Sequence, residues 1–396
     1  MYAGGMRLKS FQLLIGLLPL IMFFAAMMVA PLMAILAGLV LLGAHRAAIR
    51  GEAAREPLLF TLALLLLAWP LATSLWAIHP PIALDMWVRV ALIFMAGMLL
   101  ISDRSLVLPA RVWAGMAVAT ALSAMVPLVL VAPHMHFLWD DLARLGGNIT
   151  GFLLQGVKRG LCGISVLIWP LMAGLQRVGE RRLALGLMVL VGICIIIMHS
   201  FSAQLGFAVG FLTWALASRW PRAMSWLLML LCPLLFVLAP FIIGRFVDLP
   251  LTPVQLGLLQ MLSSGRFLIW KALMAVGGVH PWLGWGMKMT PSLPLTVAQL
   301  QLMGLPTPPL HPHCSMLQVW FELGIVGLAL YGGAIALVLR TVRHRMLGEP
   351  HIALALATVT AYLAAEFSSF SIWQNWWVAM PWLCWFLWRR LPAAAD

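Results

Sequence analysis

Long apolar stretches recur along the whole chain, and short segments that carry charged residues and prolines separate them. A helix needs about 20 apolar residues to cross the hydrocarbon core of a bilayer. With charges and prolines taken as breaks, the pattern predicts twelve apolar helices, at roughly 11–28, 30–44, 57–76, 82–101, 112–132, 160–176, 183–199, 201–218, 223–243, 316–339, 351–369 and 372–388. We therefore expect an all-α integral membrane protein with about twelve transmembrane helices.

The composition favours a single polytopic membrane domain over residues 1–396. Hydrophobic residues make up 63% of the chain and charged residues 9%, whereas soluble domains carry about 25% charged residues. Arg7 and Lys9 precede the first apolar stretch, as in a signal peptide, but the apolar sequence continues almost to Gly43. We interpret this stretch as a retained first span. The five cysteines have the spacing of neither a disulfide framework nor a zinc site.

The basic residues give a formal net charge of +13 and are distributed unevenly. In a soluble protein this charge would suggest a nucleic-acid partner, but in a membrane protein lysine and arginine mark the cytoplasmic side. With a cytoplasmic N-terminus, 17 of the 25 basic residues lie inside, where they contact anionic lipids: Arg7, Lys9, Arg46, Arg50, Arg55, Arg104, Arg111, Arg177, Arg181, Arg182, Arg219, Arg222, Arg340, Arg343, Arg345, Arg389 and Arg390. Both termini are therefore expected in the cytoplasm, with membrane lipids and no nucleic acid as partners.

The other eight basic residues lie on or near the outer side: Arg89, Arg144, Lys158, Arg159, Arg245, Arg266, Lys271 and Lys288. Positive charge on that side opposes the topological bias, so a compensating feature is expected. An anionic ligand at the outer leaflet is the simplest candidate.

Two outer connections are long, one at about 133–159 and the other at about 244–315. A connection above about 15 residues is usually functional or disordered, and the second is too apolar and aromatic to be disordered. Its middle, 264–279, is predicted to be helical, with Ser263 or Ser264 as N-cap. We expect amphipathic helices that lie at the outer boundary of the membrane.

Arg266 falls in the first turn of that predicted helix, and Lys271 follows five residues later. First-turn amides and a guanidinium group can converge on one phosphate. The alternative is that Arg266 caps a neighbouring carbonyl or extends toward lipid headgroups.

His313 opens the tenth predicted span, and Gln318 and Glu322 lie deeper in it. A histidine at this position can act as a general base near neutral pH, or it can be an ordinary interfacial residue. A carboxyl group within the membrane is costly and needs a partner. Glu366 on the eleventh span is the candidate for a hydrogen-bonded structural pair with Glu322.

The outer hairpin at 368–377 is rich in tryptophan and also contains Gln374 and Asn375. Interfacial tryptophans usually form the aromatic belt of a membrane protein. Aromatic rings with Gln and Asn amides also suit the faces and hydroxyls of a sugar, so Gln374 and Asn375 are candidates for contact with a glycan acceptor.

Several motifs together resemble the O-antigen ligase family, within the O-antigen ligase/polymerase superfamily. His313, Cys314, nine further residues and then Gly324-x-x-Gly327 fit the spacing of the family's His motif. Four further stretches are similar to family motifs in the same order: the stretch at 74–80, Lys158-Arg159-Gly160 with Trp169-Pro170, Ser264-Gly265-Arg266 with Trp270, and His280-Pro281-Trp282-Leu283-Gly284-Trp285-Gly286.

Two positions depart from the family pattern. Cys314 stands where relatives have Asn or Ser, which puts the role of that amide or hydroxyl in doubt, although Ser315 is adjacent. Relatives also often have Ser-Arg at the start of the eighth span. Here Ser202-Ala203-Gln204 lacks the arginine, so one expected cation is absent or comes from elsewhere.

The resemblance implies transfer of a glycan from an undecaprenyl-diphosphate donor to lipid A-core at the periplasmic face of the bacterial inner membrane. It points to Arg266, Arg159 and Lys158 as the groups that stabilise the departing diphosphate. His313 would be the general base or would orient a substrate, and a single displacement would invert the anomeric centre. The outer segments contain no Asp-x-Asp pair, so we expect neither a metal nor another cofactor.

Other functions stay open at this point. An O-antigen polymerase would use a similar fold and donor. A protein O-oligosaccharyltransferase often carries a larger C-terminal extension than the short segment after the last predicted span here. A transporter or flippase of lipid-linked oligosaccharides would place more polar groups near the bilayer midplane and often shows internal repeats, and neither feature is evident.

Overall fold

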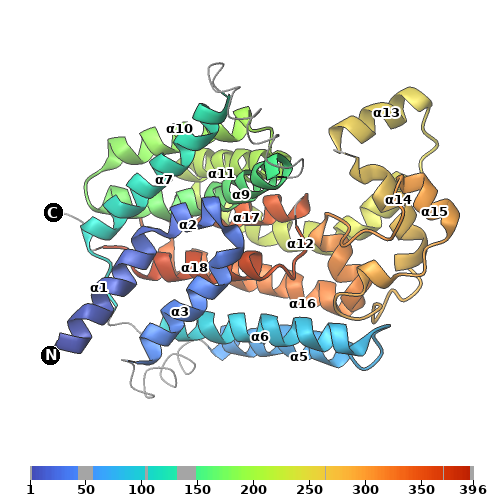
Figure 1. The fold of residues 1–396 in the computed structure, drawn as a ribbon, viewed down its shortest axis with the longest axis horizontal. Helices are drawn as coiled ribbons and strands as arrows, with labels where there is room; N and C mark the ends of the chain where they lie inside the picture. The colour runs from blue at the N-terminus through green and yellow to red at the C-terminus, as the bar shows by residue number, and fades with distance from the viewer. Residues whose placement is uncertain are drawn as a thin grey trace.

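A computed structural model describes residues 2–42, 57–102, 106–131, 149–263, 265–368 and 370–392. Helices account for most of these residues, and none of them lies in a strand. The longer helices run roughly parallel or antiparallel to one another in one bundle (Figure 1). The predicted cations Arg46, Arg50, Arg55, Arg104 and Arg144 fall outside the described residues.

The first half of the chain forms α1 (Tyr2–Gly16), α2 (Leu18–Phe24), the 3₁₀-helix η1 (Ala26–Met28), α3 (Val29–Leu41), α5 (Pro57–Thr73), α6 (Pro80–Ser102), α7 (Ala110–Val131), α9 (Ile149–Arg177) and α10 (Arg181–Ile197). The second half forms α11 (Phe201–Arg219), α12 (Pro221–Val247), α13 (Pro253–Leu262), α14 (Arg266–Gly277), the 3₁₀-helix η3 (Thr290–Ser292), α15 (Val297–Met303), α16 (Ser315–Met346), α17 (Ile352–Phe367) and α18 (Asn375–Arg389).

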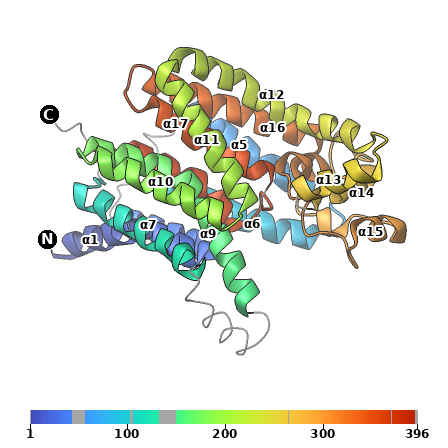
Figure 2. The ribbon, with the colours of Figure 1, turned by 90° about the horizontal axis from the view of Figure 1, so that it is seen from above.

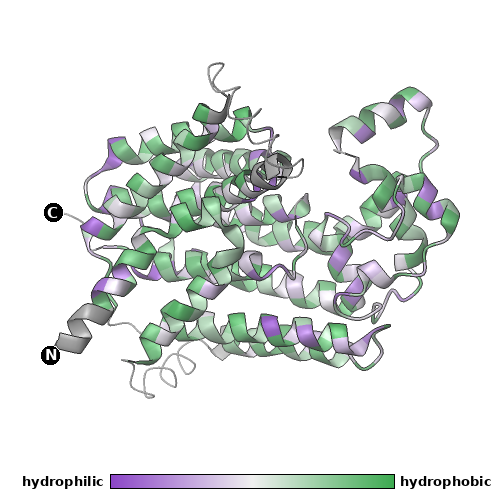
Figure 3. Ribbon diagram, viewed as in Figure 1, coloured by the Kyte–Doolittle hydropathy of each residue, from purple (hydrophilic) through white to green (hydrophobic). Residues whose placement is uncertain are grey.

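Six of these helices are long and apolar enough to cross a membrane: α6, α7, α9, α11, α12 and α16. Three shorter apolar helical stretches lie at 26–41, 60–73 and 352–367. Hydrophobic residues dominate the helices, and hydrophilic residues are most frequent near the helix ends and around α13–α15 (Figure 3). These features are those of an all-α membrane protein, while the count of twelve spans remains a prediction.

The bounds of the observed helices differ from those of the predicted segments, and α16, for example, continues to Met346 and not to 339. The first segment, 11–28, is divided into α1, α2 and η1, because α2 begins at Leu18 with Pro19 in its first turn and Ala25 has a non-helical backbone. Helix α9 begins at Ile149, within the connection predicted at 133–159, whose earlier part is outside the described residues. Helix α18 begins at Asn375 and not at 372.

Different helices lie at the two ends of the bundle. Helices α13, α14 and α15, which belong to the connection between α12 and α16, lie at one end, and α1 and the C-terminal end of α18 lie at the opposite end (Figures 1 and 2). Within the bundle α11 packs against α17, α12 against α16, and α6 against both α3 and α18. The segment just before α16 therefore emerges at the end that carries α13–α15.

Candidate functional site

Helix α16 is interrupted at Gly324, whose φ of 67° and ψ of −166° are not helical. The break leaves backbone groups without partners inside the helix, and the turn at 281–286 supplies them. The amides of Trp285 and Gly286 donate to the carbonyls of Phe321 (2.8 Å) and Glu322 (2.9 Å), and the Ile325 amide donates to the Pro281 carbonyl (2.9 Å). Irregular backbone at membrane depth requires such internal partners.

Glycines permit this close approach of two backbones. A Cβ atom on Gly324 would lie 2.1 Å from the Trp282 carbonyl oxygen, and one on Gly284 would lie 2.5 Å from the Glu322 carbonyl. Both glycines also have positive φ, which favours glycine. The His-to-Gly-x-x-Gly motif and the Pro-x-x-Gly-x-Gly turn, which are far apart in the sequence, thus form one structural unit.

Glu322 is fully buried beside this unit. Its carboxylate accepts hydrogen bonds from the Lys288 amide (2.7 Å), the Thr290 amide (3.2 Å) and hydroxyl (2.5 Å), the Gln318 side-chain amide (3.2 Å) and the Trp373 indole. These donors replace the lost hydration of a buried carboxyl group. The expected pair with Glu366 is not formed, because Glu366 accepts from the Trp377 indole at 3.1 Å instead.

Arg266 is the first residue of α14 and is half-buried. Its Nη1 donates to the Ser368 hydroxyl at the end of α17, and its guanidinium carbon lies 5.8 Å from the centre of the Phe201 ring on α11. Burial lowers the pKa of Arg266. The guanidinium thus lies near the first residue of α11, whose following residues 202–204 include no arginine.

The helix N-terminus contributes less to the site than the sequence suggests. The N-cap is Gly265 and not a serine, and Ser264 is outside the described residues. Ser263 already accepts two first-turn bonds, from the Arg266 amide to its carbonyl (3.2 Å) and from the Phe267 amide to its hydroxyl (3.1 Å). The guanidinium group, not the first-turn amides, is therefore the stronger candidate for anion binding here.

The segment 311–314 lies beside α14, because the Trp270 indole donates to the Pro312 carbonyl at 2.8 Å. His313 has a positive φ of 54°, its amide faces His311 Nδ1 at 3.3 Å, and the two imidazole centres are 4.1 Å apart. Burial, followed by the charges of His313, Lys288 and Arg266, lowers the pKa of His311 to about 3. The 311–313 turn thus lies beside α14, which Arg266 begins, and the charges of Arg266 and Lys288 both act on His311.

Cys314 is the N-cap residue of α16 and is buried. Burial raises the pKa of its thiol to about 12, so it stays neutral. The hydroxyl of the adjacent Ser315 donates to the Glu366 carbonyl at 3.0 Å.

Lys158 and Arg159 lie on α9 and are half-buried. The Ser200 hydroxyl donates to the Lys158 carbonyl at 3.5 Å, and Ser200 precedes Phe201, the residue under the Arg266 guanidinium. This chain of contacts brings α9 next to the α11 terminus. The hydrogen bonds of the described residues do not link Arg159 directly to Arg266 or His313.

The cations that the sequence places on the outer side differ in their surroundings. Arg89 is exposed and pairs with Asp85 one turn away on α6, at 3.0 Å, so its charge has a local partner. Arg245 and Lys271 are exposed. Within the described part of the chain, no carboxylate forms an ion pair with Lys158, Arg159, Arg266 or Lys288.

The tryptophans of the 368–377 hairpin form neither an exposed belt nor a sugar-binding face. Trp373, Trp376 and Trp377 are buried, and the indoles of the first and third bind Glu322 and Glu366. Gln374 is half-buried and its side-chain oxygen accepts from the Trp376 indole at 2.7 Å, while Asn375, also half-buried, begins α18.

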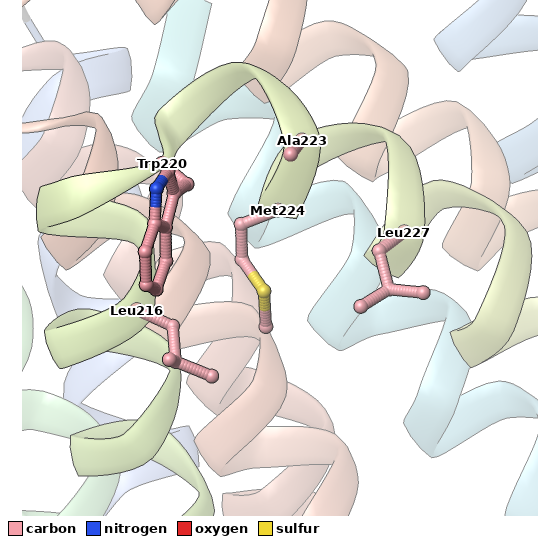
Figure 4. Close-up of a pocket in the computed structure, with 5 residues that line it drawn as sticks. All are labelled: Leu216, Trp220, Ala223, Met224 and Leu227. Atoms are coloured by element: carbon pink, nitrogen blue, oxygen red, sulfur yellow. The ribbon is translucent and has the colours of Figure 1, made fainter.

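A surface pocket lies away from these groups, at the turn between α11 and α12. Its lining is apolar: Leu216, Trp220, Ala223, Met224 and Leu227 (Figure 4). It holds no titratable side chain, and we assign it no chemistry.

Three residues of the candidate site are not identified by the sequence motifs: Ser368, Thr290 and His311.

Comparisons with known proteins agree with the motifs. Residues 186–332 match the family model described as O-antigen ligase. This range contains Arg266, Lys288, His313 and Glu322 but not Lys158 or Arg159. The resemblance drawn from the motifs is confirmed at the level of the family.

Two relatives from Rickettsia carry the provisional name polysaccharide ligase. The chain is 26% identical to the Rickettsia felis protein over 233 residues, which are 58% of this chain and 57% of that protein. It is also 26% identical to the Rickettsia conorii protein over 234 residues, 58% and 56% of the two chains. The match thus spans less than three fifths of these relatives.

Proposed function

We propose that this protein is a membrane glycosyltransferase that ligates O-antigen glycan from undecaprenyl diphosphate to lipid A-core at the periplasmic face of the bacterial inner membrane. The observation that carries the proposal is the position of the His311–His313 turn beside α14, which Arg266 begins, without an ion-paired carboxylate on Arg266 among the described residues. The similarity to polysaccharide ligases supports a lipid-linked glycan donor and a lipid acceptor.

The reaction transfers the anomeric carbon of the glycan from a phosphate oxygen to an acceptor oxygen. The acceptor hydroxyl attacks the carbon, the carbon–oxygen bond to the diphosphate breaks, and its electron pair remains on the diphosphate. Arg266 stabilises this developing charge, with Arg159 and Lys158 as further cations on α9. His313 accepts the acceptor's proton, and the single displacement inverts the anomeric centre.

The fixed position of Arg266 suits this role. Its hydrogen bond to Ser368 and its contact with the Phe201 ring orient the guanidinium and leave its other N–H groups for phosphate oxygens. Because arginine and lysine side chains can neutralise the departing diphosphate, we propose that the reaction needs no metal. Glu322, whose carboxylate is engaged by several donors, supports the loop beside the site and does not contact the acceptor.

The test is transfer of lipid-linked O-antigen to lipid A-core by the purified full chain and its variants. We expect Arg266→Ala and His313→Ala each to lower kcat/KM by about 100-fold or more, and Arg159→Ala by about 10-fold. Lys9→Ala, at the other end of the bundle, serves as the control. Folded variants with normal transfer would remove these assignments, and activity that is lost with chelator and restored by a divalent ion would contradict the metal-free mechanism.

Lipopolysaccharide from a deletion strain separates this proposal from its alternatives. Loss of a ligase leaves bare core and carrier-linked polymer, whereas loss of a polymerase leaves core with a single repeat unit. Unchanged lipopolysaccharide with an unglycosylated secreted protein would indicate a protein O-oligosaccharyltransferase. Movement of substrate across reconstituted vesicles without glycan transfer would indicate a transporter.

A further inference from the structure

Lys288 lies in a segment whose other side chains are buried. Met287, Met289 and Thr290 are fully buried, whereas Lys288 is half-buried. Neighbouring elements fix the segment on both sides: the Met287 amide donates to Thr73 Oγ1 at the end of α5 (3.1 Å), and the His79 amide contacts Met289 Sδ (3.2 Å). Within 287–290, Lys288 is therefore the side chain that an otherwise buried loop presents at the surface.

The carboxylate of the buried Glu322 accepts hydrogen bonds from this segment. The Lys288 amide donates to Glu322 Oε2 at 2.7 Å, and Thr290 donates to Oε1 from both its amide and its hydroxyl. The carboxylate thus binds the backbone of Lys288, and no ion pair joins the Lys288 ammonium to any described carboxylate. Glu322 acts as a positioning residue for a lysine whose charge it leaves unpaired.

The backbone of Lys288 is in the left-handed region, with φ of 65°. A residue with a side chain adopts this region rarely, and glycine adopts it readily. Such strained positions gather at functional sites, where the side chain contributes something that folding alone does not require. His313 is in the same region, with φ of 54°.

Lys288 also shares its surroundings with the groups of the candidate site. Its charge acts on His311 together with the charges of His313 and Arg266. His311 Nδ1 accepts a hydrogen bond from the His313 amide. The Trp270 indole of α14, the helix that Arg266 begins, donates to the Pro312 carbonyl in the same turn. The Lys288 ammonium and the Arg266 guanidinium therefore both act on His311, in the turn that Trp270 joins to α14.

We propose that Lys288 is a further anion-binding residue of this site, which binds the diphosphate of the glycan carrier together with Arg266 and is held in place by Glu322. This inference rests on the proposed function for the identity of the anion. The chemistry it commits to is a pair of linked phosphates. A single lipid headgroup phosphate is the competing source of the same chemistry.

The experiment is titration of the full chain in detergent with inorganic pyrophosphate, with thermal unfolding as readout and sulfate at equal ionic strength as reference. The decisive variant is Lys288→Gly, which removes the ammonium while its backbone suits the left-handed region. We expect its unfolding temperature without ligand to equal or exceed that of the wild type, while its affinity for pyrophosphate falls at least 10-fold. Lys288→Arg should retain binding, and Lys288→Met should lose it.

Lys9→Met is the matched control, the same substitution at an exposed lysine of α1, and should bind pyrophosphate like the wild type. Wild-type affinity in Lys288→Gly and Lys288→Met would overturn the proposal. So would a lower unfolding temperature in all three Lys288 variants, because it would assign the lysine a structural role. Competition by phosphatidylglycerol as strong as that by undecaprenyl diphosphate would assign it to lipid headgroups and also overturn the proposal.

Glycan transfer, measured in parallel, distinguishes failure of the Lys288 assignment from failure of the proposed function. Lys288→Gly should lower kcat/KM for the lipid-linked donor about 10-fold or more, so normal transfer by this variant would refute the Lys288 assignment alone. Lysine-dependent binding of pyrophosphate by a wild-type protein that transfers no glycan would refute the proposed function and leave the anion site standing.

Discussion

His311 and His313 share one short turn but lie in different surroundings. His311 is buried and its Nδ1 accepts from the His313 amide, so its proton lies on Nε2. His313 is half-buried and stands on a left-handed backbone. A neutral His311 can keep accepting this amide, whereas a protonated one would lose the acceptor. His311 therefore holds the conformation in which His313 is presented, and its protonation state links the turn to pH.

The first prediction concerns this link. The pKa of His311 is lowered from 6.5 to about 3 in the folded protein, chiefly by burial. Between these two values the unfolded chain binds a proton that the folded chain does not, so stability is fully present above pH 6.5 and is lost as the pH falls. At pH 5 this group lowers the free energy of unfolding by about 2 kcal/mol. We expect His311→Asn to lose less stability than the wild type between pH 7.5 and pH 5.

Thermal unfolding of the full chain in detergent at both pH values measures this difference. His79→Asn, at an exposed histidine, is the matched control and should keep the wild-type pH dependence. An identical loss on acidification in the wild type and His311→Asn would show that His311 does not titrate in this way.

The sequence identifies Arg266 and His313 as candidates because charged and titratable groups are rare in such an apolar chain. Their partners could not be predicted in the same way. Ser368, which accepts from Arg266, lies 102 residues away along the chain, and Thr290 lies 32 residues from Glu322. Hydroxyl residues are common, and only tertiary packing selects which of them meets a given charge.

At the scale of elements, the broken α16 connects the motifs to the site. The turn at 281–286 occupies the break at Gly324, and the loop that follows it is bound by Glu322, one turn of helix or less from the break. The Trp69 indole on α5 donates a further hydrogen bond to the Leu323 carbonyl at 2.9 Å. The glycine motifs thus set the position of the loop that carries Lys288.

The second prediction tests this coupling. Gly324→Ala would place a Cβ 2.1 Å from a backbone oxygen at a position with φ of 67°. We expect it to lower the free energy of unfolding by about 3 kcal/mol or more, because neither backbone can move away without loss of the bonds across the break. Unfolding monitored by the reactivity of the buried free cysteines reports this loss.

Gly333→Ala on the same helix is the control. Nothing lies within 4 Å of a Cβ at that position, and alanine is the better helix former by about 0.5–1 kcal/mol. This variant should unfold at the wild-type temperature or slightly above it. Equal behaviour of the two alanine variants would contradict the role assigned to the break.

Apolar periodicity locates most helices, but it does not reveal how they are interrupted. Gly324 has no proline beside it, and glycine also occurs within continuous membrane helices, so the sequence alone favours an uninterrupted span at 316–339. The tryptophan hairpin is a similar case. Burial of its indoles depends on Glu322 and Glu366, which two other helices carry.

At the scale of the whole molecule, the half-buried cations Arg266 and Lys288 belong to the same part of the chain as α13–α15, and neither forms an ion pair among the described residues. Arg177, at the end of α9, pairs with Glu349 at 3.0 Å. The described ends of the chain lie opposite α13–α15 (Figure 2). This arrangement agrees with the charge bias of the sequence, in which most lysines and arginines mark the cytoplasmic side.

The last prediction addresses orientation. If both termini are cytoplasmic, α15 faces the periplasm, and a membrane-impermeant maleimide should label Val297→Cys in intact cells, since Val297 is 71% exposed. Lys9→Cys, which is also exposed, should be labelled only after lysis. A Cys232→Ala background removes the one native cysteine that is not buried. Labelling in the reverse order would place Arg266, His313 and Lys288 in the cytoplasm, where a periplasmic glycan donor could not reach them.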